Sequence, residues 1–164
     1  MKSHRILSVL LLIPVFPLTA TGAPTFSNAN IQGQYKCTLT AYSLPPKANQ
    51  PFAAAAIGDL TIAADGNGRF TAGTWDHTID APGAHAGCKL TMTAGSYSIN
   101  ADGSGLENTT WQLSKGDSSP DCLTYFSEGT ATGSADVMMT DPSGKIFYSS
   151  SISRFAILAV ACQK

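Results

Sequence analysis

Two similar segments decide the fold class of this chain. They read GDLTIAADGNG at residues 58–68 and GSYSINADGSG at residues 95–105. In each segment, apolar and polar residues alternate before an Asp-Gly pair. Alternation with a period of two is typical of a half-buried strand, and Asp and Gly tolerate the positive φ angles that short hairpins need. Each segment is therefore predicted to be a strand that turns into a β-hairpin.

The same alternation continues outward over most of the chain, and no stretch shows a convincing helical period. Strands that follow one another in a sheet must hide their edges, and closure into a barrel does this completely. We therefore expect an all-β fold, an antiparallel up-and-down barrel of about eight strands, with a two-sheet β-sandwich as the alternative. Examples of residues that share the apolar parity are Tyr35 and Leu39, Leu90 and Met92, Trp111 and Leu113, and Val137 and Met139.

The N-terminal residues have the pattern of a secretory signal peptide. Lys2 and Arg5 are basic, residues 6–18 are mostly apolar, and small residues follow at Ala20 and Gly22. A basic start, a short apolar run and small residues in this order are typical of a cleaved export signal. We therefore expect a signal peptide at residues 1–23, a single domain at residues 24–164, and a secreted or periplasmic location.

The composition limits the classes of partner. Charged residues make up 13% of the 164 residues, and the net charge is −1. A chain without a basic cluster is poorly suited to nucleic acid. After the predicted signal peptide, no apolar segment is long enough to span a membrane. The expected partner is therefore a small apolar ligand or a secreted protein.

Four cysteines fit an exported protein. Their even number predicts two disulfides, for which three pairings are possible. We favour Cys37 with Cys162 and Cys88 with Cys122, because the first and last strands are neighbours when a sheet closes on itself. No Cys-x-x-Cys motif occurs, and after residue 23 there are just two histidines. We therefore expect no metal site and no cofactor.

The richest polar stretch runs from Trp75 to His85. We expect it to form a loop at one mouth of the barrel, where functional residues are common. Asp76, His77 and Asp80 in such a loop could form an acid–base pair or a weak metal site. The alternative, which we prefer, is a solvated loop. The candidate loop residues are Asp76, His77, Asp80 and His85.

Large apolar side chains could line a cavity inside the barrel. A small barrel can also be filled by its own side chains, so these residues are more simply a packed core. The candidate ligand-binding residues are Trp75, Tyr97, Trp111, Phe126, Met139 and Tyr148.

A few charged residues interrupt otherwise strand-like segments. One of them could point inward and orient a ligand's polar group, but we expect all of them on the solvent face. These residues are Arg69, Glu107, Glu128 and Arg154.

A family resemblance accompanies these patterns. The segment at residues 95–105, together with GQYKC at residues 33–37, resembles a group of small exported bacterial proteins with lipocalin-like (calycin-type) barrels. Tyr35 stands where the Gly-x-Trp motif of lipocalins has tryptophan. The resemblance implies a barrel and suggests an apolar ligand.

Three functions are consistent with the sequence. The first is a secreted, non-catalytic barrel that binds a small apolar ligand by burying its surface. The second is an inhibitor or other protein-binding module that acts through disulfide-held loops at residues 75–88 and 114–122. The third is an isomerase or cyclase of the allene oxide cyclase type, with Glu107 or Glu128 as the acid or base. The sequence leaves open whether the chain is an enzyme, and we prefer the non-catalytic function.

Overall fold

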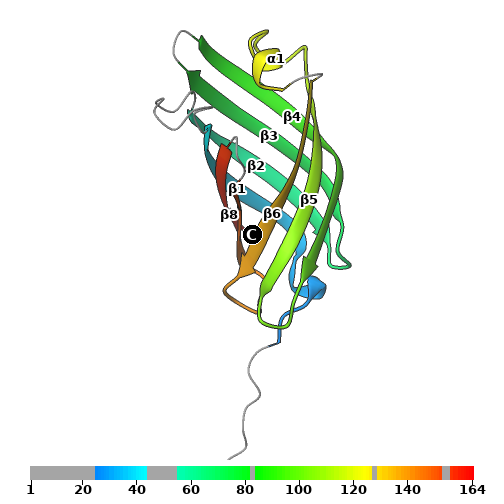
Figure 1. Cartoon of the computed structure of the whole chain (residues 1–164). Helices are drawn as coiled ribbons and strands as arrows, with labels where there is room; N and C mark the ends of the chain where they lie inside the picture. Colours follow the sequence, from blue (N-terminus) through cyan, green and yellow to red (C-terminus); the bar gives the residue numbers. More distant parts are fainter. Residues whose placement is uncertain (1–24, 44–54, 82–83, 127–128, 153–155) are drawn as a thin grey trace, which may run out of the picture.

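The computed structural model describes residues 25–43, 55–81, 84–126, 129–152 and 156–164. In this part of the chain, eight antiparallel strands pair in sequence order and close into a barrel (Figure 1). The all-β barrel predicted from the sequence is confirmed, and the two-sheet alternative is wrong. The predicted signal peptide at residues 1–23 lies outside the described residues. The strands are β1 (Gln32–Ser43), β2 (Ala55–Asp65), β3 (Phe70–Ala81), β4 (Ala84–Ile99), β5 (Ser104–Leu113), β6 (Thr130–Met139), β7 (Ile146–Ile152) and β8 (Ala156–Gln163).

The hydrophobic core follows from the alternation of side chains along each strand. In β1, Tyr35, Cys37 and Leu39 are buried, while Thr38 and Thr40 between and beyond them are exposed. Successive side chains of a strand point to opposite faces, so one parity fills the barrel and the other meets solvent. The predicted apolar parity is therefore the inward one.

The Asp-Gly turns end their strands as expected. At the β2–β3 turn, the Asn67 amide donates a hydrogen bond of 2.7 Å to Asp65 Oδ1, and Gly66 has a φ of 79°. At the β4–β5 turn, the Ser104 amide donates a hydrogen bond of 2.9 Å to Asp102 Oδ1, and Gly103 has a φ of 87°. The aspartate side chain holds each turn, and glycine supplies the positive φ.

The long strand β4 changes its inward parity part-way along. Leu90 and Met92 face inward at one end, and Tyr97 faces inward at the other. The pairing with β5 shifts register between Met92 and Ala94, as it does at a β-bulge. The bulge therefore lets Tyr97 face inward although its position has the opposite parity to Met92.

Both predicted disulfides are present. Cys37 and Cys162 are direct neighbours on β1 and β8, and their sulfur atoms are bonded at 2.04 Å. Cys88 on β4 is bonded to Cys122 at 2.02 Å. Cys122 begins the short helix α1 (Cys122–Tyr125). The first disulfide therefore joins the strands that close the barrel, and the second attaches α1 to the wall.

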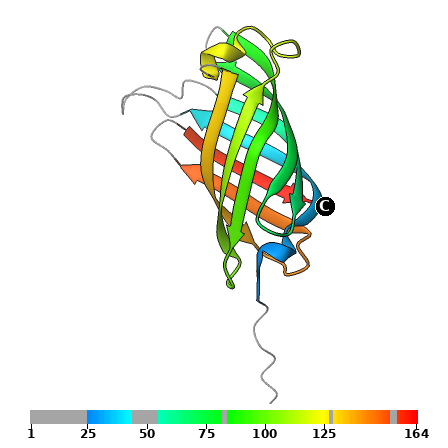
Figure 2. The same ribbon diagram turned by 90° about the vertical axis from the view of Figure 1, so that its right-hand side faces the viewer.

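Short segments cover the two ends of the barrel. The 3-10 helix η1 (Asn28–Asn30) and α1 lie at opposite ends in Figures 1 and 2. At the η1 end, Tyr97 Oη donates a hydrogen bond of 2.5 Å to the Ile31 carbonyl, and Ile31 is fully buried. At the other end, the segment before α1 is held to β4. The Ser119 amide donates a hydrogen bond of 2.8 Å to the Gly87 carbonyl.

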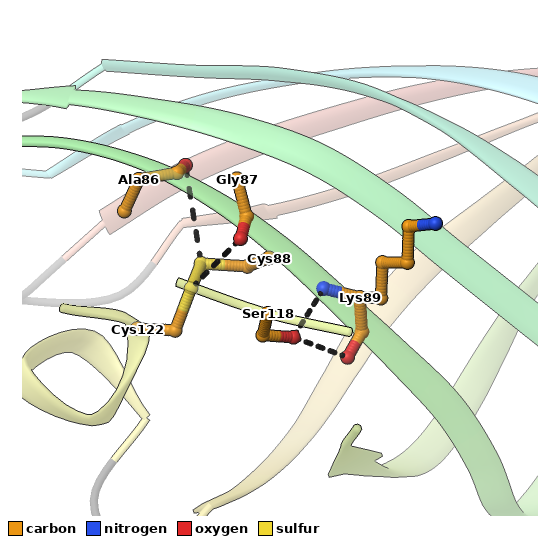
Figure 3. The surroundings of a disulfide bond; sticks show 6 residues. All are labelled: Ala86, Gly87, Cys88, Lys89, Ser118 and Cys122. Atoms are coloured by element: carbon orange, nitrogen blue, oxygen red, sulfur yellow. Dashed lines mark hydrogen bonds between the residues drawn. A yellow bond between two sulfur atoms is a disulfide. The ribbon is translucent and has the colours of Figure 1, made fainter. Parts of the chain in front are cut away.

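Figure 3 shows how a disulfide and a serine attach residues 118–125, the cap at this end of the barrel, to β4. The Lys89 amide donates a hydrogen bond of 2.9 Å to Ser118 Oγ, and Ser118 Oγ is 3.3 Å from the Lys89 carbonyl oxygen. Cys88 lies beside Lys89 on β4, so the covalent and polar contacts fall on adjacent residues. The disulfide and these hydrogen bonds therefore all join the cap to the same strand, β4.

The barrel wall is uneven at β6. Strand β6 pairs with β5 over nine residue pairs, but with β7 over four, from Asp136–Ser150 to Met139–Phe147. Residues 130–135 of β6 thus run beyond the paired part of β7.

Over the described ranges, none of the helices has the length and apolar character to cross a bilayer.

Candidate functional site

The barrel encloses a cavity of about 460 Å³. Seven of the eight strands contribute to its wall, β4 being the exception. Most of the side chains that face it are apolar, and two of them are the tryptophans of the chain. These apolar side chains include Leu39, Leu60, Ile62, Trp75, Trp111 and Phe147.

The cavity reaches the outside between β6 and the β7–β8 hairpin. Thr132 and Ser134 of β6 and Ile152 of β7 line it, and all three are exposed to solvent. This is the place where β6 extends past its pairs with β7. A small molecule could therefore enter through the side of the barrel.

Glu107 is the most unusual residue of the cavity. It projects inward from β5 and is 9% exposed. Ser149 Oγ donates a hydrogen bond of 2.6 Å to Glu107 Oε1, while Oε2 is buried and has no hydrogen-bond partner among the described residues. Burial raises the pKa of Glu107, and the hydrogen bond from Ser149 partly opposes this.

The sequence-based expectation that the scattered charges face solvent is wrong for Glu107. Arg69 is exposed as expected, while Glu128 and Arg154 lie outside the described residues. Glu107 shares the parity of Trp111 on the same strand, and both are buried. That shared parity indicated an inward position for Glu107. Carboxyl groups are so rarely buried, however, that the residue type favoured an exposed position.

Trp75 carries a second unpartnered polar atom. It lies on β3 and lines the cavity, and its Nε1 is buried without a hydrogen-bond partner in the described part of the chain. Its ring makes an edge contact with the ring of Trp111, with centroids 5.7 Å apart. Buried indole N–H groups usually find an acceptor, so this donor is available to a ligand.

His77 lies next to Trp75 in the barrel interior. It is 3% exposed, and its ring is stacked on the Trp75 ring with centroids 4.5 Å apart. Burial lowers the pKa of His77 from 6.5 to about 4, although nearby Asp76 acts in the opposite direction. His77 is therefore neutral at physiological pH. Phe126, just after α1, contacts the His77 ring at 5.5 Å.

The predicted loop around His77 is wrong. Residues 75–81 belong to β3 and residues 84–88 to β4, so this stretch is a strand pair. Asp76, Asp80 and His85 face solvent, whereas His77 faces inward. The structure thus places the side chain of His77 on the opposite face of β3 from both carboxylates. A histidine in the inward row concealed the alternation of this strand in the sequence.

Two exposed ion pairs join β3 and β4 on the outer surface of the barrel. His85 Nδ1 lies 3.7 Å from Asp80 Oδ1, and Lys89 Nζ lies 3.8 Å from Asp76 Oδ2. Exposed pairs of this kind contribute little free energy. Within the described ranges, no group of three or more His, Cys, Asp and Glu side chains is arranged to hold a metal ion.

Two of the six candidate ligand-binding residues line the cavity. Trp75 and Trp111 line the cavity. Tyr97 and Met139 are buried but belong to the packed core, and Phe126 packs against Trp75 at 6.0 Å. Tyr148 differs from the expectation because it is 45% exposed on the outside of β7, where Phe147 and Ser149 take the inward positions.

No protein-family model and no curated protein matches this chain.

Proposed function

We propose that this chain is a secreted or periplasmic, non-catalytic barrel that binds a small, largely apolar ligand in its interior. The observation that carries the proposal is the cavity of about 460 Å³, whose wall is mostly apolar. Small-molecule sites in proteins are typically about 300 to 1,000 Å³ and combine apolar walls with a few polar groups. Burial of the ligand's apolar surface would supply about 25 cal/mol per Å².

The proposed location has independent support. Two disulfides join all four cysteines of the chain. Such pairs persist in oxidising compartments and are rare in the cytosol. The predicted signal peptide at residues 1–23 and the resemblance to exported lipocalin-like proteins agree with this location.

Tryptophan fluorescence gives a direct test of ligand binding. Both tryptophans of the chain, Trp75 and Trp111, line the cavity, so a bound molecule should change their emission. Titration with the transparent probe 1-octanol should give a saturable change. Native mass spectrometry of the exported protein should reveal any retained molecule.

Matched variants localise the binding. Ala135→Phe places a large ring inside the cavity and should abolish the fluorescence change, because Ala135 faces the cavity. Ala159→Phe adds the same ring on the exposed face of β8 and should leave it unchanged. If neither a retained molecule nor a saturable signal is found with 1-octanol, octylamine or octanoate, the proposal fails.

Glu107 supports a second candidate function, an isomerase or cyclase. Its buried carboxyl group has a raised pKa and could donate a proton to a bound molecule. Incubation with 1,2-epoxyoctane should then give a rearranged product, and Glu107→Gln should abolish the conversion. Absence of any conversion by the unaltered protein would count against catalysis of this type.

The inhibitor alternative draws less support from the structure. Much of its first proposed loop, residues 75–88, lies in the paired strands β3 and β4. The second, residues 114–122, is held against β4 by the Cys88–Cys122 disulfide and could still present a rigid surface.

A further inference from the structure

We infer that the ligand carries a protonated amine, which pairs with the carboxylate of Glu107 inside the barrel. This inference rests on the proposed function, because it specifies the polar group of the molecule that the cavity binds. Two observations support it. One carboxyl oxygen of Glu107 has no hydrogen-bond partner among the described residues, and none of the other described side chains that line the cavity is ionisable.

Glu107 sets the charge of the cavity. Among the described residues that line it, Glu107 is the one ionisable side chain, and no basic group accompanies it. An anionic ligand would therefore meet no counter-charge and would be repelled when Glu107 is ionised. Fatty acids and other carboxylates are thus poor candidates. A cation would compensate the cost of keeping the carboxylate away from water.

The free oxygen of Glu107 shows where the cation would bind. Ser149 already occupies Oε1, and Oε2 has no hydrogen-bond partner in the described part of the chain. A buried polar atom left unpaired costs free energy, so a ligand that donates a hydrogen bond to Oε2 would recover part of that cost. An ammonium N–H donor would satisfy Oε2 and form a charge-assisted hydrogen bond.

A neutral alcohol would not need this carboxyl group. Hydroxyl groups of Thr109, Ser149 and Ser151 line the same cavity and could bind an alcohol without a charge. The aromatic rings of the wall also favour a cation, because the face of an indole or phenyl ring attracts positive charge. The rings in question belong to Trp75, Trp111 and Phe147.

The position of Glu107 in the wall gives the ligand an orientation. Glu107 pairs with Ala135 on β6, and Ala135 is the first residue beyond the last β6–β7 pair, Asp136–Ser150. The carboxyl group is thus next to the side opening. Trp111 lies further along β5, toward the end that α1 covers. The amine would therefore stay near the opening, with the apolar part of the ligand extending toward Trp111.

Three probes of equal chain length test the inference: octylamine, 1-octanol and octanoate. Their affinities for the purified protein are measured by tryptophan fluorescence and by calorimetry at pH 7. Octylamine should bind at least about ten-fold more tightly than 1-octanol, and octanoate should bind most weakly. Glu107→Gln should remove most of the preference for octylamine while leaving the affinity for 1-octanol within about three-fold.

Asp136→Asn is the matched control. It removes one negative charge from the exposed face of β6, beside the strand position of Glu107 but outside the cavity. The three affinities should not change in this variant. A general attraction of the protein for cations would instead be reduced equally by both substitutions, which would contradict the inference.

The outcomes separate the two proposals. If 1-octanol binds as tightly as octylamine, or if Glu107→Gln keeps the full preference, the amine inference is wrong and the ligand-binding proposal stands. If none of the three probes binds, the proposed function itself fails. The ranking on the unaltered protein requires no variant, so it decides the question even if Glu107→Gln does not fold.

Discussion

Glu107 and His77 are buried ionisable side chains, and burial shifts the pKa of each in the direction that favours its neutral form. The pKa of Glu107 is raised, and the pKa of His77 is lowered to about 4. In both cases the charged form loses its hydration inside the barrel. Because one residue is an acid and the other a base, they impose opposite pH dependences on stability. Single substitutions can separate the two contributions.

His77 should make the protein less stable as the pH falls from 6.5 toward 4. In this interval the unfolded chain binds a proton at the histidine and the folded chain does not, so the free energy of unfolding decreases. The shift of the pKa from 6.5 to about 4 corresponds to a loss on the order of 3 kcal/mol. Urea denaturation between about pH 7 and pH 4.5 measures it.

The two histidines provide the control for this prediction. His77→Gln should remove the loss, whereas His85→Gln should keep it, since His85 is exposed on β4. An equal pH dependence in both variants would contradict the assignment to His77.

Glu107→Gln should stabilise the empty protein at pH 7. The folded chain binds a proton at Glu107 more tightly than the unfolded chain does, so the contribution of Glu107 to stability falls as the pH rises from 4.5 toward the raised pKa. Glutamine keeps the shape and removes this penalty. Denaturation at pH 7 should show a higher free energy of unfolding for the variant, and the gain should disappear near pH 4. A less stable variant at pH 7 would show that the carboxyl group is structurally required.

At the scale of the elements, tight turns limit which residues the chain accepts. Gly144 follows the turn that starts at Asp141, where the Gly144 amide donates a hydrogen bond of 3.0 Å to the Asp141 carbonyl. Its φ is 65°, and an added Cβ would lie 1.7 Å from the Asn30 carbonyl oxygen. The turn between β6 and β7 therefore packs directly against η1.

Gly144→Ala should lower the free energy of unfolding by about 2 to 4 kcal/mol, because strain at positive φ adds to the clash with Asn30. Gly116→Ala is the control, since an added Cβ there meets no atom within 4 Å. Thermal denaturation of the two variants gives the comparison. A similar melting temperature in both would contradict the packing of this turn against η1.

The elements also show where sequence patterns succeed. Asp65-Gly66 and Asp102-Gly103 predicted hairpins correctly, because the turn geometry depends on local side-chain hydrogen bonds and glycine φ angles. Residues 75–80 were predicted as a loop although they form a strand. Their inward row contains His77, a polar residue that breaks the apolar pattern. The rings of Trp75 and Phe126 pack against His77 in the folded protein, and the local sequence does not reveal these contacts.

At the scale of the whole molecule, closure of the barrel depends on β1 and β8. These strands are neighbours over eight residue pairs although they lie at opposite ends of the described chain. The Cys37–Cys162 bond joins residues separated by 125 positions, and Cys88–Cys122 joins residues separated by 34. A longer loop loses more entropy when it is closed in the unfolded chain.

The double substitution Cys37→Ser/Cys162→Ser should lower the free energy of unfolding by roughly 4 to 5 kcal/mol, and Cys88→Ser/Cys122→Ser by roughly 3 to 4 kcal/mol. The first should act on the whole barrel, while the second should mainly increase hydrogen exchange in residues 114–126. Denaturation and hydrogen exchange of both variants measure these effects. A larger global loss from the second pair would contradict the role of Cys37–Cys162 in closure.

The sequence by itself determined most of the strand pattern, the Asp-Gly hairpin turns and the favoured pairing of the cysteines, because these depend on local alternation and on the order of strands. Tertiary structure alone decided that the barrel keeps a cavity, that it opens beside β6, and that Glu107 faces into it. The volume left inside a barrel depends on how side chains from all strands fit together, and the burial of one carboxyl group depends on neighbours such as Ser149, 42 residues away along the chain. No local pattern encodes such distances.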